Sequence, residues 1–95
     1  MTTREKNRQR LFEFLITQKC KDCNESDLRV LTFDHRDRNK KKATISSMIH
    51  DALPWSEVQK ELKKVDCVCH NCHVKRECIR DNSARQQFWE ELNGE

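Results

Sequence analysis

Four of the six cysteines form two C-x-x-C pairs, Cys20 with Cys23 and Cys69 with Cys72. Each pair can close on one side of a tetrahedral zinc ion, and four thiolates complete a structural zinc site. The segment between the pairs is longer than the usual spacing of about 15–20 residues, so we expect other elements to be inserted there. Redox use of a C-x-x-C pair needs a strand–helix context on a larger domain, and a disulfide framework needs an oxidising compartment. The spacing therefore favours zinc.

A second set of residues has the types needed to hold a divalent ion beside a proton acceptor. Asp34 and His35 end a segment with strand character, and His73 follows the second cysteine pair directly. Carboxylate and imidazole ligands suit a divalent ion that keeps positions open for phosphate. A neighbouring imidazole can accept a proton near neutral pH. Each residue alone is more commonly structural, so the hypothesis of phosphodiester hydrolysis depends on their combination.

Basic residues follow His35 immediately. The net charge of +3 is too small to indicate nucleic acid by itself, but the cations are concentrated in one short stretch. Such a stretch can follow a phosphate backbone, although a solvated loop has the same composition. The residues expected to bind nucleic acid are Arg36, Arg38, Lys40, Lys41, Lys42, Lys75 and Arg76.

The elements that must position these residues can be predicted from periodicity and capping signals. Thr2 and Glu5 have the spacing of a capping box, which predicts a helix over about 3–18. Residues 28–35 are rich in β-branched and aromatic side chains and predict a strand, with a second short strand at 66–69. The remaining predictions are a helical turn over 44–49, a helix capped by Ser56, a helix that begins inside the second cysteine pair, and a last helix capped by Ser83. Phe88 and Trp89, at helical spacing in that last helix, are interpreted as core residues.

Length and composition limit what the chain can be. With 95 residues, 37% charged, we expect one α+β domain whose small core needs a metal for stability. A single glycine argues against a P-loop or a dinucleotide-binding loop. No apolar run predicts a membrane span, and the basic N-terminus has no secretory pattern. The expected location is therefore cytoplasmic. Cys67 and Cys78 are expected to be small buried residues.

These motifs in this order resemble the small HNH endonucleases of phages and bacteria, whose fold is the ββα-metal (His-Me finger) type. The resemblance runs from about Arg10 to Arg76 and leaves the residues after about Ile79 uncovered. It rests on Cys20-Lys-Asp-Cys23, Phe33-Asp34-His35, Trp55-Ser-Glu-Val and Val68-Cys69-His-Asn-Cys72-His73. Together with the helix predicted at the C-terminal end, it leads us to expect a single nuclease domain over 1–95. This domain has an N-terminal helix (1–18), a zinc-stapled core with an inserted helix (19–79) and a C-terminal helical tail (80–95).

The resemblance also implies the roles of the site residues. Cys20, Cys23, Cys69 and Cys72 would hold structural Zn²⁺, and Asp34 with His73 would hold a catalytic ion, Mg²⁺ or another divalent ion such as Mn²⁺, Ni²⁺ or Zn²⁺. His35 would activate water to hydrolyse DNA. Where many members have their middle asparagine this chain has Lys64. Asn71 is therefore a catalytic candidate, which either orients the base or only caps the helix.

Two alternatives remain open from the sequence. The chain could be a zinc-stapled nucleic-acid-binding module that does not cut. It could also be a phage accessory nuclease that acts with the packaging terminase, which would give the C-terminal helix a partner to bind.

Overall fold

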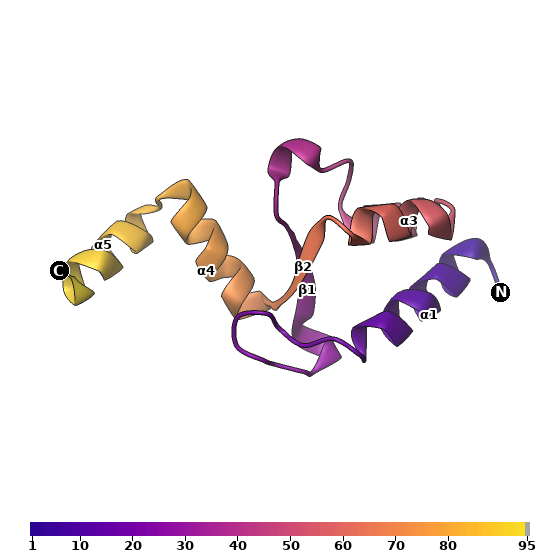
Figure 1. Cartoon of the computed structure of the whole chain (residues 1–95), viewed down its shortest axis with the longest axis horizontal. Coiled ribbons are helices and arrows are strands. Elements are labelled where there is room, and N and C mark those ends of the chain that lie inside the picture. Colours follow the sequence, from indigo (N-terminus) through magenta and orange to yellow (C-terminus); the bar gives the residue numbers. More distant parts are fainter. Residues whose placement is uncertain (95) are drawn as a thin grey trace.

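The computed structural model describes residues 1–94 and has an α+β fold (Figure 1). Five α-helices surround a two-stranded antiparallel sheet. The elements in chain order are α1 (Thr3–Leu15), β1 (Leu31–His35), α2 (Ile45–His50), α3 (Trp55–Leu62), β2 (Val65–Cys69), α4 (His70–Asp81) and α5 (Ala84–Asn93), with 3₁₀ turns at Leu28–Val30 and Arg38–Lys40. The order β1–β2–α4, with α2 and α3 inserted, is the ββα arrangement expected from the sequence.

The register of the sheet decides which residues lie at each end. Leu31 pairs with Cys69 at one end, and His35 pairs with Val65 at the other. β2 continues directly into α4, for which Cys69 is the N-cap. The sheet therefore has one end beside the second cysteine pair and another end at which Asp34 and His35 stop.

The core lies between the sheet and the helices of the first two-thirds of the chain. α1 buries Leu11 and Leu15, and its buried Asn7 donates from Nδ2 to the carbonyl of Leu53 at 2.7 Å, just before α3. The other buried core residues are Cys20, Leu31, Ile45, Met48, Ile49, Val58, Val68, Cys69 and Cys72. The view in Figure 1 shows α1 and α3 on one side of the sheet and α4 on the other.

Several predicted elements are confirmed, and their ends are corrected. The capping box of Thr2 and Glu5 is present, but α1 ends at Leu15 rather than 18, because the amides of Thr17 and Gln18 bond three residues back in tighter turns. The first strand begins at Leu31, since the Asp27 side chain caps a 3₁₀ turn over 28–30. Ser56 is not the N-cap of α3; Pro54 is, with no side-chain hydrogen bond.

The C-terminal helix differs most from its prediction. Ser83 caps α5 as expected, its side chain accepting a hydrogen bond from Gln86 N. However, α5 buries no residue, and Phe88 and Trp89 are 52% and 59% exposed. Their interpretation as core residues is therefore wrong. The helical spacing was correct, but α5 packs mainly against α4 and projects beyond the sheet (Figure 1). The expected tail (80–95) extends to Glu95, which lies outside the described residues.

Helix length and composition also bear on membranes. Within residues 1–94, no helix combines the length and the apolar character that crossing a bilayer requires.

Candidate functional site

The four predicted zinc ligands come together in space. One ligand atom each from Cys20, Cys23, Cys69 and Cys72 lies within 4.8 Å of every other, although the pairs are far apart in the chain. The Sγ atoms of Cys23 and Cys69 are 3.7 Å apart. In the described part of the chain, no other group of three or more histidine, cysteine or acidic side chains is this close. These thiols can hold one metal ion.

Local backbone structure explains how each cysteine pair is shaped. In the first pair, the Asn24 amide bonds the Cys20 carbonyl at 2.8 Å, and Asn24 takes the left-handed conformation with φ 68°. In the second pair, Cys69 Sγ accepts a hydrogen bond from the Cys72 amide at 3.5 Å, as an N-cap does. The Lys21 amide bonds the Cys67 carbonyl at 2.9 Å, which joins the first turn to β2.

The environment of Cys20 favours the thiolate that a metal ion needs. Burial opposes ionisation of this thiol, but backbone hydrogen bonds from both cysteine pairs lower its pKa to about 6. Cys67 and Cys78 lie outside the cluster and are half-buried rather than fully buried. Burial raises the pKa of Cys67, so it stays a neutral thiol.

Three of the predicted site residues, Asp34, His35 and His73, line one cleft of about 590 Å³ beside the end of β1. Asp34 and His35 lie at the end of β1, and His73 lies near the start of α4. The lining also includes two cationic side chains from the loop after β1, Arg38 and Lys41, and one from α4, Arg80. The other residues that line the cleft are Thr32, Phe33, Thr44, Ile45, Ser46 and Glu77. Carboxylate, imidazole and cationic side chains thus line the same cleft.

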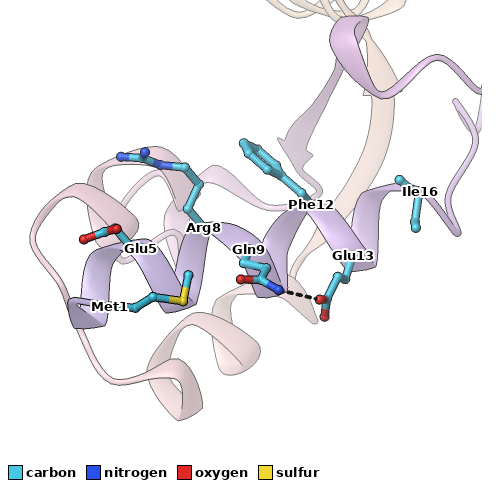
Figure 2. A pocket seen from close by; sticks show the side chains of 7 residues that line it. All are labelled: Met1, Glu5, Arg8, Gln9, Phe12, Glu13 and Ile16. Carbon is cyan, nitrogen blue, oxygen red and sulfur yellow. Dashed lines mark hydrogen bonds between the residues drawn. The ribbon is translucent and has the colours of Figure 1, made fainter.

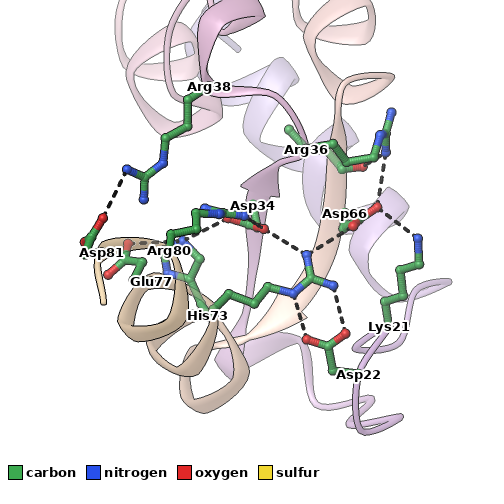
Figure 3. Close-up of polar contacts among 12 residues, drawn as sticks. Lys21, Asp22, Asp34, Arg36, Arg38, Asp66, His73, Glu77, Arg80 and Asp81 are labelled. Carbon is green, nitrogen blue, oxygen red and sulfur yellow. Dashed lines mark hydrogen bonds and ion pairs between the residues drawn. The ribbon is translucent and has the colours of Figure 1, made fainter. Parts of the chain in front are cut away.

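Asp34 is the buried carboxylate of this cleft, at 1% exposed. Its Oδ1 lies 3.8 Å from His73 Nε2, whereas Oδ2 accepts hydrogen bonds from Arg76 and Arg80 (Figure 3). Burial opposes ionisation, but the two guanidinium groups lower the pKa of Asp34 below its ordinary value. The carboxylate is therefore charged, and Oδ1 is the oxygen that faces His73.

Arg76 connects the cleft with the cysteine cluster. Its Nη1 lies 2.8 Å from Asp34 Oδ2 and 3.1 Å from Asp66 Oδ2, and its Nε and Nη2 bond both oxygens of Asp22, between the cysteines of the first pair. Figure 3 shows these three carboxylates converging in this way. The hydrogen bonds from Arg76 lower the pKa of Asp22. Arg76 was predicted to bind nucleic acid, but its guanidinium is occupied by this network.

His35 has a buried acidic partner from α3. Its Nε2 lies 2.7 Å from Oε2 of Glu61, and the two side chains are 7% and 1% exposed. Burial opposes ionisation of Glu61, but hydrogen bonds from Lys64, the Lys42 amide and His35 lower its pKa to about 2. Glu61 is therefore an ionised hydrogen-bond acceptor behind the histidine.

The other predicted nucleic-acid contacts are distributed unevenly. Only Arg38 and Lys41 line the cleft. Arg36 instead bonds the carbonyls of Lys63 and Val65 and the Asp66 side chain, and Lys42 pairs with Glu57 at 3.2 Å. Lys40 and Lys75 are exposed, and Lys75 lies at a different hollow between α4 and α5. Asn71 is exposed on the first turn of α4 and does not line the cleft.

Two site residues were missed by sequence reasoning, and each had a usable signal. Glu61 lies three residues after Val58, on the face of α3 that is buried, where a charged residue is unusual. Arg80 lies seven residues after His73 and four after Arg76, which puts all three on one face of α4. A charged residue on a buried or ligand-bearing face could have marked both.

A further hollow lies on the outer face of α1 (Figure 2). It is lined by Met1, Glu5, Arg8, Gln9, Phe12, Glu13 and Ile16, and Gln9 bonds Glu13 within it at 3.2 Å. These residues belong to one helix and its N-terminus, and they include no histidine, cysteine or buried charge. This hollow is therefore not a candidate catalytic site.

No protein-family model matches the chain, and neither a curated protein nor a solved structure matches it. Its function must be inferred from its own residues.

Proposed function

We propose that the chain is a metal-dependent endonuclease of the HNH type that hydrolyses phosphodiester bonds in DNA. The observation that carries this proposal is the convergence of Asp34, His35 and His73 in one cleft, at the junction of β1 and α4. A buried charged carboxylate, two imidazoles and flanking cations match the chemistry that hydrolysis of a phosphodiester requires.

Asp34 and His73 are the residues that would hold the catalytic divalent ion. Their Oδ1 and Nε2 atoms are 3.8 Å apart and supply one oxygen and one nitrogen ligand, which suits an ion with positions left for water and phosphate. A bound ion of this kind would stabilise negative charge on the phosphate and on the leaving oxygen. The guanidinium groups of Arg76 and Arg80 hold Asp34 in its charged, ligating form.

The remaining steps belong to the side chains of the cleft. His35 accepts a proton from the water that attacks phosphorus, since it lies in the cleft with a buried carboxylate behind its ring. Arg38 and Lys41, at the cleft margin, bind phosphate groups of the DNA backbone. Such contacts carry no sequence information, so this cleft predicts cleavage with little base preference.

The thiol cluster is proposed to hold zinc in a structural role. Four cysteine ligands leave no position for substrate, which is typical of structural zinc. The cluster would join β2, α4 and the turn after α1 at the end of the sheet opposite Asp34 and His35, and it would hold the start of α4, the helix that carries His73.

A nicking assay with supercoiled plasmid tests the proposal, with Mg²⁺, Mn²⁺, Ni²⁺ or Zn²⁺ added separately. We expect His35→Ala and Asp34→Asn to lower the rate by roughly 100-fold or more, because general-base catalysis and the ion are each lost. His50→Ala is the matched control, since His50 is an exposed histidine outside the cleft. A wild-type rate for His35→Ala would contradict the proposal.

A second candidate function is DNA binding without cleavage. The specific observation that favours it is the engagement of Asp34 Oδ2 by Arg76 and Arg80, which leaves this carboxylate one oxygen for an ion. A mobility-shift titration of wild type at several salt concentrations distinguishes the two. Salt-sensitive binding with no nicking in any of the four metals would favour the binding module.

A further inference from the structure

Glu61 is a buried charge that the proposed chemistry does not use. It lies on α3 at 1% exposed, on the face that also buries Val58. An ionised carboxylate in such a place is costly unless each oxygen has partners. Glu61 must therefore be held by specific contacts, and those contacts indicate what it does.

Each oxygen of Glu61 is occupied. Oε1 accepts a hydrogen bond from Lys64 Nζ at 3.0 Å. Oε2 accepts one from the Lys42 amide at 3.0 Å and lies 2.7 Å from His35 Nε2. The contacts to Lys42 and Lys64 fix the carboxylate relative to the basic loop and the end of α3, so it cannot follow a movement of the imidazole.

These contacts decide which nitrogen of His35 carries the proton. An ionised carboxylate can only accept hydrogen bonds, so Nε2 of His35 is the donor in this pair. A neutral imidazole that donates from Nε2 has its lone pair on Nδ1.

The position of Nδ1 follows from burial. Within residues 1–94, every buried side-chain nitrogen or oxygen has a hydrogen-bond partner. Nδ1 of His35 has none among these residues. Nδ1 is therefore not fully buried, and His35 lines the cleft that it shares with Asp34 and His73.

We propose that Glu61 is the positioning residue of His35, holding the imidazole in the Nε2–H form with the Nδ1 lone pair facing the cleft. This inference rests on the proposed function, because it makes Nδ1 the atom that accepts the proton. It also gives Glu61 the task of orienting the base, which the sequence left open for Asn71 because Lys64 stands at the usual place of the asparagine. Lys64 contributes by bonding Glu61, whereas Asn71 lies outside the cleft.

Two measurements on the full-length chain test it. The first is long-range ¹H–¹⁵N NMR of the histidine rings in wild type, with His35→Ala used to assign the signals. We expect the Nε2–H tautomer for His35, and an Nδ1–H tautomer would overturn the proposal. Because this readout needs no cleavage, absence of nicking by wild type would refute the proposed function without deciding the position of the ring.

The second measurement compares the cleavage kinetics of Glu61→Gln with those of Glu57→Gln. Glu57 lies on the same helix and pairs with Lys42 and Lys60 at the surface, so it is a matched control. We expect Glu61→Gln to lower kcat roughly 10- to 100-fold with little change in KM, and Glu57→Gln to leave kcat unchanged. Thermal unfolding followed by circular dichroism checks that both variants are folded. A folded Glu61→Gln variant with wild-type kcat would overturn the proposal.

Discussion

The two ends of the small sheet contain different kinds of side chain. At the end where Leu31 pairs with Cys69, four thiols gather around one point. At the end where His35 pairs with Val65, buried carboxylates meet cations: Glu61 meets Lys64, and Asp34 meets Arg76 and Arg80. One end is suited to a metal ion that stabilises the fold, and the other presents charged groups to a cleft.

This difference teaches how so small a chain can support a polar site. Buried charges contribute little net stability and demand exact partners, so they cannot hold the sheet together by themselves. A metal ion bound by the four thiolates would supply stability at a point away from the cleft. Arg76 is the link between the two ends, because it bonds Asp22 in the first cysteine turn as well as Asp34 and Asp66.

The largest expected effect comes from destroying the thiol end. Binding of a structural zinc is worth about 10–16 kcal/mol, comparable with the whole stability of a small domain. Cys72→Ser, or removal of metal by a strong chelator, should therefore unfold the chain rather than only inactivate it. Far-UV circular dichroism and metal content measured by mass spectrometry follow this together.

Cys78→Ser is the control for that experiment, because Cys78 is half-buried on the same helix and lies outside the cluster. It should keep both its metal and its helical signal. A metal-free chain with an unchanged far-UV spectrum would show that metal binding at the thiol end is not what stabilises the fold.

The same contrast decides what could be predicted from the sequence. The thiol end depends on two local motifs, Cys20 with Cys23 and Cys69 with Cys72, and ligand chemistry fixes their geometry whatever lies between. Asp34 and His35 were found because they end a recognisable strand.

Glu61 was missed because its partner lies 26 residues away in the chain, and only the tertiary fold brings them together. The exposure of Phe88 and Trp89 was missed for a related reason. Periodicity identifies an apolar face, but it does not tell whether another element covers that face.

A smaller effect should follow from cutting the link between the ends. Arg76→Ala leaves buried Asp34 and Asp66 each short of a cation, which we expect to cost about 2–3 kcal/mol of unfolding free energy. Urea unfolding of the metal-loaded protein measures this. Arg29→Ala is the control, since Arg29 pairs with Asp27 at the surface and should change nothing measurable. Equal effects of the two substitutions would mean that the network around Arg76 does not join the ends.

The pH dependence of stability should separate thiolates from carboxylates. The pKa of Glu61 is about 2 in the folded chain against an ordinary 4.5, so its stabilising contribution is complete above about pH 4.5 and is lost as the pH falls through the folded value. As the pH falls below about 4.5, the urea midpoints of wild type and Glu61→Gln should therefore approach each other, because the carboxylate takes up its proton. Between about pH 8 and pH 5, loss of stability should instead coincide with metal release, because protons compete with the metal ion for the thiolates as the pH falls. Curves that converge above pH 5 would contradict the low pKa of Glu61.

The smallest effect is expected from the helix that belongs to neither end. α5 buries no residue, whereas α1, at the other terminus, buries Asn7, Leu11 and Leu15. A chain that ends at Ser83 keeps the cap of α4, in which Asn82 is left-handed and the Ser83 amide bonds the Cys78 carbonyl at 3.1 Å. We expect it to lose less than about 1 kcal/mol of unfolding free energy and to nick DNA as wild type does, because surface changes away from packed contacts cost little.

Removing residues 1–16 should instead cost at least about 4 kcal/mol of unfolding free energy, since two buried leucines are lost. Trp55 on α3 remains in both shortened chains and reports unfolding by fluorescence. Comparable losses from the two truncations would mean that α5 supports the fold through contacts other than burial, and that the division of the molecule at its sheet is incomplete.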